Sequence, residues 1–359
     1  MKIIIATGGT KGHINPALGL ASALKKKVSV EIIFVSPNKE LKNILTKEGI
    51  KAYIIPNPRI KLNSPFSLIS GLFMLFFALV ASIYYLAKIR PQVVVGFGGY
   101  AAFPLVFSAC VLGIPAAIHE QNVVMGKANR VLSYLVKKIL VSFEDTKELL
   151  KSRKITVTGN PIREGLRKID KGQAIKYLGL EENLFTILVM GGSSGAHNIN
   201  EKFAQALTSK NIKDKGIQVI HLTGKNDFEF INQFYKTINL KSRVYSFSEE
   251  IAYFFSAADL VISRAGGSTI SELSYFQVPA VLIPYPYAGA HQKENAKALT
   301  KNNKAVMIED DKLDAETLAG YIEDFIAHPE KLSMMRERFF KESELNSREK
   351  IVQEVLALS

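Results

Sequence analysis

The sequence has one cysteine, no tryptophan and no D-x-D triplet among its 359 residues. A lone Cys110 excludes a disulfide framework and any multi-cysteine zinc or iron–sulfur site, and it is typical of a reducing compartment. No His, Asp and Glu residues show the spacing of metal ligands, so neither a metal nor a cofactor is expected. The first residues, MKIIIATGGT, lack the apolar core and cleavage site of a signal peptide, which favours cytoplasmic synthesis and residence.

The remaining composition is that of a globular protein. Hydrophobic residues make up 47% of the chain and charged residues 22%, with 24 glycines and 13 prolines. These proportions exclude a disordered, collagenous or low-complexity protein. A chain of this length is expected to form two domains, because one ordinary domain has about 100–200 residues.

Positive charge is concentrated in the first half. Residues 1–163 hold 22 Lys and Arg against 7 Asp and Glu, a net charge of +15, whereas residues 164–359 hold 24 and 26, a net charge of −2. An anionic partner is therefore expected on the first half only. The basic residues are scattered and no zinc-finger, homeodomain-like or RNP pattern occurs, so no nucleic acid is expected and an anionic membrane surface is favoured.

A run of 22 residues without charge extends from Phe66 to Ala87. It is long enough to span a bilayer, but a buried core helix and an interfacial helix remain alternatives. Basic residues flank it, with Lys61 before and Lys88 after, and a spanning helix would separate strands of one sheet. Partial insertion is therefore favoured. The residues expected to contact the membrane are Leu72, Phe73, Phe76 and Phe77.

Short apolar, β-branched runs alternate with helical patterns along the chain, as in buried parallel sheets. In the first half, strands are expected at Lys2–Ala6, Val30–Val35, Ala52–Ile55, Gln92–Val95, Pro115–Ile118, Ile139–Val141 and Ile155–Val157. In the second half, they are expected at Phe185–Met190, Ile217–His221, Arg243–Tyr245, Leu260–Ser263, Ala280–Ile283 and Ala305–Ile308. The pattern predicts two doubly wound α/β domains with a boundary near Gly159–Pro161.

Each predicted domain begins with a strand that ends in a glycine-rich loop, Gly8–His13 in the first and Gly191–Ala196 in the second. Such a loop before a helix lets backbone N–H groups approach a phosphate, although tight turns also need glycine. Neither loop is G-x-G-x-x-G, no acid ends the strand Ile32–Val35, and no P-loop motif occurs. A dehydrogenase and a P-loop kinase are therefore excluded.

Polar residues also follow other predicted strands, at Gly96–Tyr100, His119–Asn122, Ser263–Glu272 and Ala290–Ala296. The carboxyl ends of parallel strands face the crevice where open α/β sheets bind ligands. These loops are therefore the candidate binding site.

Seven segments carry a family resemblance: GGTKGHINPALGLA, GFGGYAAFP, HEQN, TGNPIR, GGSSGAHNIN, SRAGGSTISE and HQKENA. In this order and spacing, from about Lys2 to at least Ala305, the chain closely resembles the peptidoglycan N-acetylglucosaminyltransferases of the GT-B superfamily. The resemblance implies an α/β GT-B fold of two doubly wound, Rossmann-like parallel-sheet domains facing a cleft. Residues 1–160 would bind the acceptor and the membrane, residues 161–340 would bind the donor, and a helix in 341–359 would pack back on the first domain.

The activity implied is inverting, metal-independent transfer of N-acetylglucosamine from UDP-N-acetylglucosamine. The acceptor is the 4-hydroxyl of undecaprenyl-diphosphate-linked N-acetylmuramoyl-pentapeptide, and the enzyme would lie peripherally on the cytoplasmic face of the membrane, with other cell-wall synthesis proteins as further partners. Alternatives are a GT-B enzyme for another lipid, an enzyme that hydrolyses or epimerises UDP-N-acetylglucosamine, and a non-catalytic membrane scaffold.

The resemblance also assigns the donor site. Glu272 would accept hydrogen bonds from the ribose hydroxyls, although an acid early in a helix also stabilises the helix dipole. Arg163 would lie near the nucleotide or form a linker salt bridge, Gln292 would contact donor hydroxyls, and Ser248 matches the segment that reads uracil. The donor-binding residues implied are Thr10, Lys11, Gly12, Asn122, Arg163, Gly192, Ser193, Ser248, Gly267, Ser268, Thr269, Glu272 and Gln292.

Transfer needs a base near the acceptor hydroxyl. His13 is the first candidate because imidazole titrates near neutral pH, and Glu120 is the alternative. Asn122 would orient the acceptor or a sugar amide, since an amide is not basic, and His119 is a candidate packing residue. The acceptor-binding residues implied are Gly8, Gly9, Gly98, Gly99, Tyr100 and Gln121, and His197, His221 and His328 are expected to be structural.

One residue departs from the family pattern, since Lys11 stands where relatives usually carry glycine. If that position required a positive φ, Lys would cost about 1 kcal/mol of strain. The alternative is that its ammonium helps to hold the acceptor diphosphate.

Overall fold

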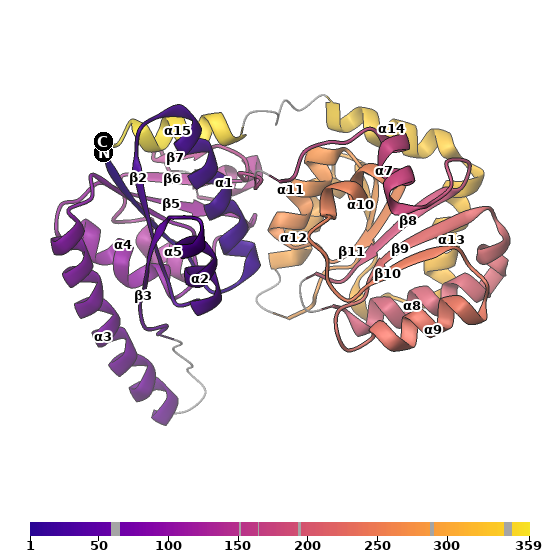
Figure 1. Ribbon diagram of the computed structural model, residues 1–359, viewed down its shortest axis with the longest axis horizontal. Helices are drawn as coiled ribbons and strands as arrows, with labels where there is room; N and C mark the ends of the chain where they lie inside the picture. Colours follow the sequence, from indigo (N-terminus) through magenta and orange to yellow (C-terminus); the bar gives the residue numbers. More distant parts are fainter. Residues whose placement is uncertain (59–64, 151, 164, 193–194, 288–290, 341–346) are drawn as a thin grey trace. The chain divides into compact units, whose positions relative to one another are not determined.

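The computed structural model describes residues 1–58, 65–150, 152–163, 165–192, 195–287, 291–340 and 347–359. It divides into two compact units, Met1–Glu164 with Asn346–Ser359, and Gly165–Leu345 (Figure 1). The first unit thus extends a few residues beyond the expected boundary and includes the end of the chain. Ser193 and Lys61, the basic residue before the apolar run, lie outside the described residues.

The first unit contains a parallel sheet with the strand order β3-β2-β1-β4-β5-β6-β7. Its strands are β1 (Lys2–Ala6), β2 (Glu31–Ser36), β3 (Lys51–Ile54), β4 (Val93–Gly96), β5 (Ala116–Glu120), β6 (Lys138–Val141) and β7 (Ile155–Val157). The strand order reverses on either side of β1, so the loops after β1 and β4 lie at the topological switch point where such sheets bind ligands.

β5 ends two residues later than expected. His119 pairs with Leu140 and Glu120 with Val141 in the parallel register with β6. The pattern placed both residues in a loop because they are polar, but their side chains are almost fully buried and hydrogen-bonded within the unit. Hydrogen bonding removes the usual cost of burying a polar group in a strand.

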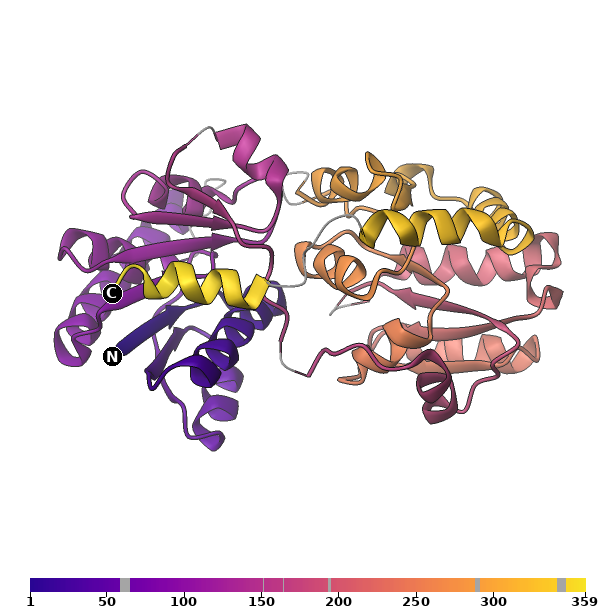
Figure 2. The same cartoon turned by 90° about the horizontal axis from the view of Figure 1, so that it is seen from above.

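Helices cover both faces of this sheet. They are α1 (Lys11–Lys27), α2 (Lys39–Lys47), α3 (Pro65–Ile89), α4 (Ala102–Val111), α5 (Lys127–Leu132), α6 (Glu144–Leu150) and α15 (Ser347–Leu356). The last helix, α15, lies against α1 (Figure 2), and its Ile351, Val352 and Val355 are fully buried in the same core cluster as Leu20 and Leu24 of α1.

α3 leaves most of its surface uncovered. Its buried residues Ala78, Ser82 and Leu86 form a narrow seam, while Phe73, Phe76 and other large apolar side chains are exposed. Within the described residues, Phe66–Ile89 is the one segment long and apolar enough to cross a membrane by length and composition, and 17% of its most apolar window is buried. A wholly buried core helix is therefore wrong for this segment.

The second unit contains a parallel sheet with the order β10-β9-β8-β11-β12-β13. Its strands are β8 (Phe185–Met190), β9 (Ile217–Leu222), β10 (Ser242–Tyr245), β11 (Leu260–Ser263), β12 (Ala280–Leu282) and β13 (Ala305–Met307). Its helices are α7 (Lys171–Leu178), α8 (His197–Thr208), α9 (Phe228–Thr237), α10 (Ile251–Ala257), α11 (Gly267–Phe276), α12 (His291–Thr300), α13 (Ala315–Ala327) and α14 (Pro329–Phe340), with short 3-10 helices at Ser209–Asp214 and Asp310–Lys312. The switch point here lies between β8 and β11, so the loops after these strands form its candidate site.

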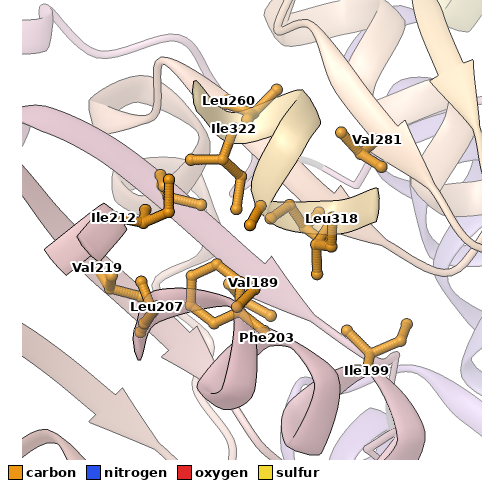
Figure 3. Close-up of a cluster of buried hydrophobic side chains, with 14 of the residues drawn as sticks. Val189, Ile199, Phe203, Leu207, Ile212, Val219, Leu260, Val281, Leu318 and Ile322 are labelled. Atoms are coloured by element: carbon orange, nitrogen blue, oxygen red, sulfur yellow. The ribbon is translucent and has the colours of Figure 1, made fainter. Parts of the chain in front are cut away.

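One face of this second sheet is packed by α8 and α13. Phe203 of α8 and Leu318 and Ile322 of α13 are fully buried against Val189 and Val219 of the sheet (Figure 3). This packing holds the amino end of α8 next to the glycine loop that follows β8.

Candidate active site

The glycine loop after β1 leads directly into α1. Thr10 is the N-cap residue, Lys11 is the first helical residue, and Thr10 Oγ1 lies 2.9 Å from Nδ1 of His13. Lys11 does not have the positive φ that would have strained it, so the expected cost at this position is absent. Its side chain is exposed at the amino end of the helix, where anions are favoured.

Three glycines surround the imidazole ring of His13. A Cβ on Gly8 would lie 2.9 Å from its Nδ1, and a Cβ on Gly98 would lie 3.2 Å from its Cδ2. Gly99 borders the same ring, and both Gly98 and Gly99 have positive φ, 76° and 78°. The loops after β1 and β4 therefore form a slot that admits the ring only because they lack side chains.

The slot changes the basicity of His13. Burial lowers the pKa of the imidazole below its ordinary 6.5, and the negative charge of Glu120 opposes that shift. The histidine is therefore neutral at physiological pH, which is the form that can accept a proton.

Glu120 is a buried hydrogen-bond hub with 2% of its surface exposed. Its carboxylate accepts bonds from the backbone N–H groups of Asn122 at 3.1 Å and Gly126 at 3.0 Å, and from the side-chain amides of Asn122 at 3.1 Å and Asn129 at 2.9 Å. Four donors occupy the lone pairs that a base would use, so the carboxylate organises the loop that presents Asn122.

His119 and Gln121 are turned into the unit. His119 Nε2 donates to the carbonyl of Gly159 at 3.0 Å, while its Nδ1 accepts from Gln121 Nε2 at 3.2 Å. Burial lowers the pKa of His119 to about 4, so it is a neutral packing residue. Gln121 also donates to Phe97 O at 3.3 Å and is 3% exposed, whereas Tyr100 is 45% exposed at the same edge of the sheet.

In the second unit, the glycine loop after β8 packs tightly against the loop after β9. Gly195 has a φ of 80°, and a Cβ there would lie 2.4 Å from the carbonyl oxygen of Thr223. Gly192 has a φ of 90° with open space around it. The loop then enters α8 at His197, which places the positive end of the α8 dipole beside it.

Below this loop lies a buried network. His221 Nε2 donates to Asn200 Oδ1 at 3.0 Å, and Nδ1 accepts from the Tyr235 hydroxyl at 2.8 Å. Asn200 in turn donates to Thr223 O at 2.9 Å and to Asp227, which also bonds His197 at 2.9 Å. Burial lowers the pKa of His221 to about 3, so His221 is a neutral residue of this network.

The second half of this site is the amino end of α11. Gly266 is the N-cap, and Gly267, Ser268 and Thr269 form the first turn. The Ser268 hydroxyl is buried and has no hydrogen-bond partner among the described residues. Glu272 follows one turn later and is half-buried.

Gln292, the second residue of α12, is oriented by the backbone. Its Oε1 accepts bonds from the N–H groups of Ala265 at 3.1 Å and Tyr285 at 2.9 Å. The side-chain amide nitrogen therefore remains as a hydrogen-bond donor. Ser248 lies after β10 at the same sheet edge, where its hydroxyl accepts from the Glu250 N–H at 3.0 Å.

Sequence reasoning gave no role to two further residues that build the site, Asn129 outside every motif and Arg264 within the SRAGGSTISE segment. Asn129 lies in α5 and completes the Glu120 hub. Arg264, 9% exposed, donates to the carbonyl of Ile283 at 3.2 Å and pairs with Asp310, which fixes the loop after β11. Only their buried polar contacts reveal these roles. In the described part of the chain, no three His, Cys, Asp or Glu side chains gather as a metal site would require.

Family models match two segments that together cover most of the chain. Residues 3–141 match the glycosyltransferase family 28 N-terminal domain and residues 186–355 match the glycosyltransferase family 28 C-terminal domain. The chain belongs to glycosyltransferase family 28. Its fold and the resemblance carried by the seven motifs are thereby confirmed, as GT-B with two parallel-sheet domains.

Relatives within family 28 cover nearly the full length. The UDP-N-acetylglucosamine--N-acetylmuramyl-(pentapeptide) pyrophosphoryl-undecaprenol N-acetylglucosamine transferase of Myxococcus xanthus (strain DK1622) is 35% identical over 341 residues, 94% of this chain and 88% of that protein. The enzyme of the same name from Thermoanaerobacter sp. (strain X514) is 36% identical over 98% of both chains. The crystal structure of Acinetobacter baumannii MurG superposes with a TM-score of 0.78 at 27% identity, covering 99% of this chain and 100% of that one.

Proposed function

We propose that this family 28 chain transfers N-acetylglucosamine from UDP-N-acetylglucosamine to the 4-hydroxyl of an undecaprenyl-diphosphate-linked N-acetylmuramoyl-pentapeptide. The observation that carries the proposal is the identity of 35–36%, over nearly the whole chain, to enzymes that bear this activity in their names. The alternative activities, hydrolysis or epimerisation of the UDP-sugar, need no lipid acceptor. Dependence of turnover on the acceptor therefore separates them.

The second unit is proposed to bind the donor. The amino ends of α8 and α11 offer N–H groups and positive dipole ends to the diphosphate, and Ser268 offers an unpaired hydroxyl. Glu272 would accept from the ribose hydroxyls, and the Gln292 amide nitrogen would donate to a sugar oxygen. With the charge of the leaving UDP balanced in this way, the reaction is proposed to need no metal.

His13 is proposed as the base that accepts the proton of the acceptor hydroxyl. If Nδ1 donates to Thr10, Nε2 is the free basic nitrogen, as in other positioned catalytic histidines. The acceptor oxygen then bonds to the anomeric carbon on the face opposite to UDP, and the bonding pair leaves with the UDP oxygen. Glu120 is disfavoured as the base because four donors hold its carboxylate.

The first unit is also proposed to dock peripherally on the cytoplasmic face of the membrane. The acceptor carries a polyprenyl chain that stays in the bilayer, so its binding unit must reach that surface. The exposed apolar face of α3 and the net charge of +15 in residues 1–163 supply buried area and attraction to anionic lipids.

The direct test is transfer of labelled sugar from UDP-N-acetylglucosamine to a short-chain lipid-diphosphate-muramoyl-pentapeptide, with and without EDTA. Product that requires the acceptor and resists EDTA is expected. Loss of product with EDTA, restored by Mg²⁺, would contradict the metal-free route. Release of free sugar or epimer without acceptor would replace the proposed activity.

Glu272→Ala tests the donor site in the same assay. Loss of hydrogen bonds to the ribose should raise the KM for UDP-N-acetylglucosamine by about tenfold or more, since a hydrogen bond to a charged group contributes about 1.5–3 kcal/mol. The KM for the acceptor should change little. An unaltered donor KM and kcat would remove Glu272 from the site and leave it a helix-dipole role.

A further inference from the structure

The linker at 159–163 is held by side chains from elsewhere in the first unit, although it forms no helix or strand. Arg348 of α15 makes the strongest of these contacts. Its Nε donates to the carbonyl of Ile162 at 2.6 Å, and its Nη2 donates to the carbonyl of Arg163 at 2.8 Å. One guanidinium thus fixes two consecutive peptide groups, a bidentate geometry that a lysine ammonium cannot reproduce.

Two preceding carbonyl groups of the linker also accept hydrogen bonds from side chains. His119 donates to Gly159 O at 3.0 Å, and the Ser347 hydroxyl donates to Asn160 O at 3.3 Å. Gly159 has a φ of 72°, and a Cβ there would lie 3.0 Å from that of Ser347. The start of α15 and the end of β5, which are far apart in sequence, therefore both hold the linker by hydrogen bonds to its carbonyl groups.

α1 is the third element that packs against the linker. A Cβ on Gly19 would lie 2.5 Å from the carbonyl oxygen of Pro161, so the linker backbone rests directly on the helix. Arg163, by contrast, has a buried Nε with no hydrogen-bond partner among the described residues. No hydrogen bond at that nitrogen holds the side chain, so the position of the Arg163 backbone matters for where the guanidinium lies.

We propose that Arg348 is a positioning residue for donor binding, which acts by fixing the backbone of Arg163. The inference rests on the proposed function and on the expectation, which the family resemblance implies, that the Arg163 guanidinium lies near the donor nucleotide. Because Arg348 lies on the last helix, the end of the chain helps to set the geometry of a group that serves the reaction. Small displacements of positioning groups have large kinetic effects, up to about 100-fold for a shift of 1 Å.

The test compares Arg348→Ala with wild type in steady-state transfer and in calorimetric binding of UDP, using the full chain. The donor KM is expected to rise about tenfold or more, with the acceptor KM nearly unchanged. Arg348→Lys keeps the charge but should rescue only part of the loss. Amide hydrogen exchange at residues 159–163 should quicken in Arg348→Ala.

A double-mutant cycle with Arg163→Ala distinguishes positioning from stability. If Arg348 acts through Arg163, the double variant should have the same donor KM as Arg163→Ala alone, whereas independent effects would add. Glu349→Gln is the matched control, because Glu349 lies on the same helix and makes an exposed ion pair with Lys27 at 3.8 Å. It should leave the donor KM unchanged.

Three outcomes would overturn the inference: an unchanged donor KM in Arg348→Ala, additive effects in the cycle, or full rescue by lysine. If Arg348→Ala does not fold, Arg348→Lys replaces it in the double-mutant cycle with Arg163→Ala. Failure of the proposed function itself is distinct, since wild-type protein would then give no acceptor-dependent product.

Discussion

His13 has its place because its neighbours have no side chains. Gly8, Gly98 and Gly99 bring backbone to within contact distance of the ring, and two of them need a positive φ that other residues rarely adopt. The same close packing removes water from the imidazole and lowers its pKa. Position and basicity therefore have one cause, the meeting of two glycine loops.

His13→Gln should lower kcat by about 100- to 10,000-fold, the usual contribution of general acid–base catalysis. In the wild type, the active form is the neutral imidazole, so kcat/KM should fall as the pH drops through a pKa below 6.5 and stay level near neutrality. The variant should lose this acidic limb, because the titrating group is gone.

Measurement of kcat/KM from pH 5 to 8 checks this prediction, with UDP affinity as the control. The donor groups of the second unit are untouched, so UDP should bind the variant as it binds the wild type. An acidic limb that persists in His13→Gln would assign the proton transfer to another group.

At this scale the sequence predicts which residues gather, and not what each one does. His13 and Asn122 follow strands of one sheet and Glu120 ends one, so their proximity follows from topology. One of the four hydrogen bonds that the Glu120 carboxylate accepts comes from Asn129, which lies nine residues further along the chain and outside every motif. A one-dimensional pattern cannot contain such a contact, because it exists only after the chain folds.

At the scale of elements, the apolar runs predict strands reliably because buried parallel strands have no polar face. β1, β7, β8 and β11 begin and end at the expected residues. The error at β5 has a physical reason: a strand that enters the site carries polar residues satisfied by hydrogen bonds rather than by water. Strand ends at functional edges are therefore the least predictable part of the fold.

Replacing Phe73, Phe76 and Phe77 of α3 by Ser should release the protein from anionic vesicles. All three rings are exposed, at 63%, 60% and 45%, so the change costs little folding stability. Each buried aromatic side chain contributes about 1.5–3 kcal/mol on leaving water, so vesicle affinity should fall by more than 100-fold. Vesicle flotation measures the loss.

Phe230→Ser is the matched control for α3. Phe230 is 56% exposed but lies on α9 of the second unit, so the variant should float with vesicles like the wild type. Turnover of a soluble short-chain acceptor should survive in the α3 variant. Unchanged flotation of the triple variant would mean that another surface binds the membrane.

Over the whole molecule, the excess positive charge lies in the half that is proposed to bind the membrane and not in the half that is proposed to bind the donor. The donor is a diphosphate, yet residues 164–359 carry a net charge of −2, so that half cannot attract it by net charge. In the proposed donor site, the affinity would come from local groups, the helix amino ends and the glycine loop. The first half, with a net charge of +15, is suited to a longer-range attraction to an anionic surface.

This division predicts different responses to salt. The Debye length shrinks from about 10 Å at 0.1 M to about 3 Å at 1 M, which weakens attraction between a charged surface and a membrane. Each basic residue near an anionic bilayer contributes about 1 kcal/mol, so vesicle affinity should fall steeply as NaCl rises. UDP affinity should fall much less, since its contacts are short-ranged.

Two measurements at low and high salt would separate the long-range attraction to the membrane from the short-range contacts with UDP. They are flotation with anionic and with uncharged vesicles, and calorimetry with UDP. Binding to uncharged vesicles should be weak and nearly independent of salt, because it reports the apolar face of α3 alone. Equal binding to both vesicle types at low salt would mean that the excess charge serves the acceptor diphosphate instead. A UDP affinity as salt-sensitive as vesicle binding would contradict the division of charge between the two halves.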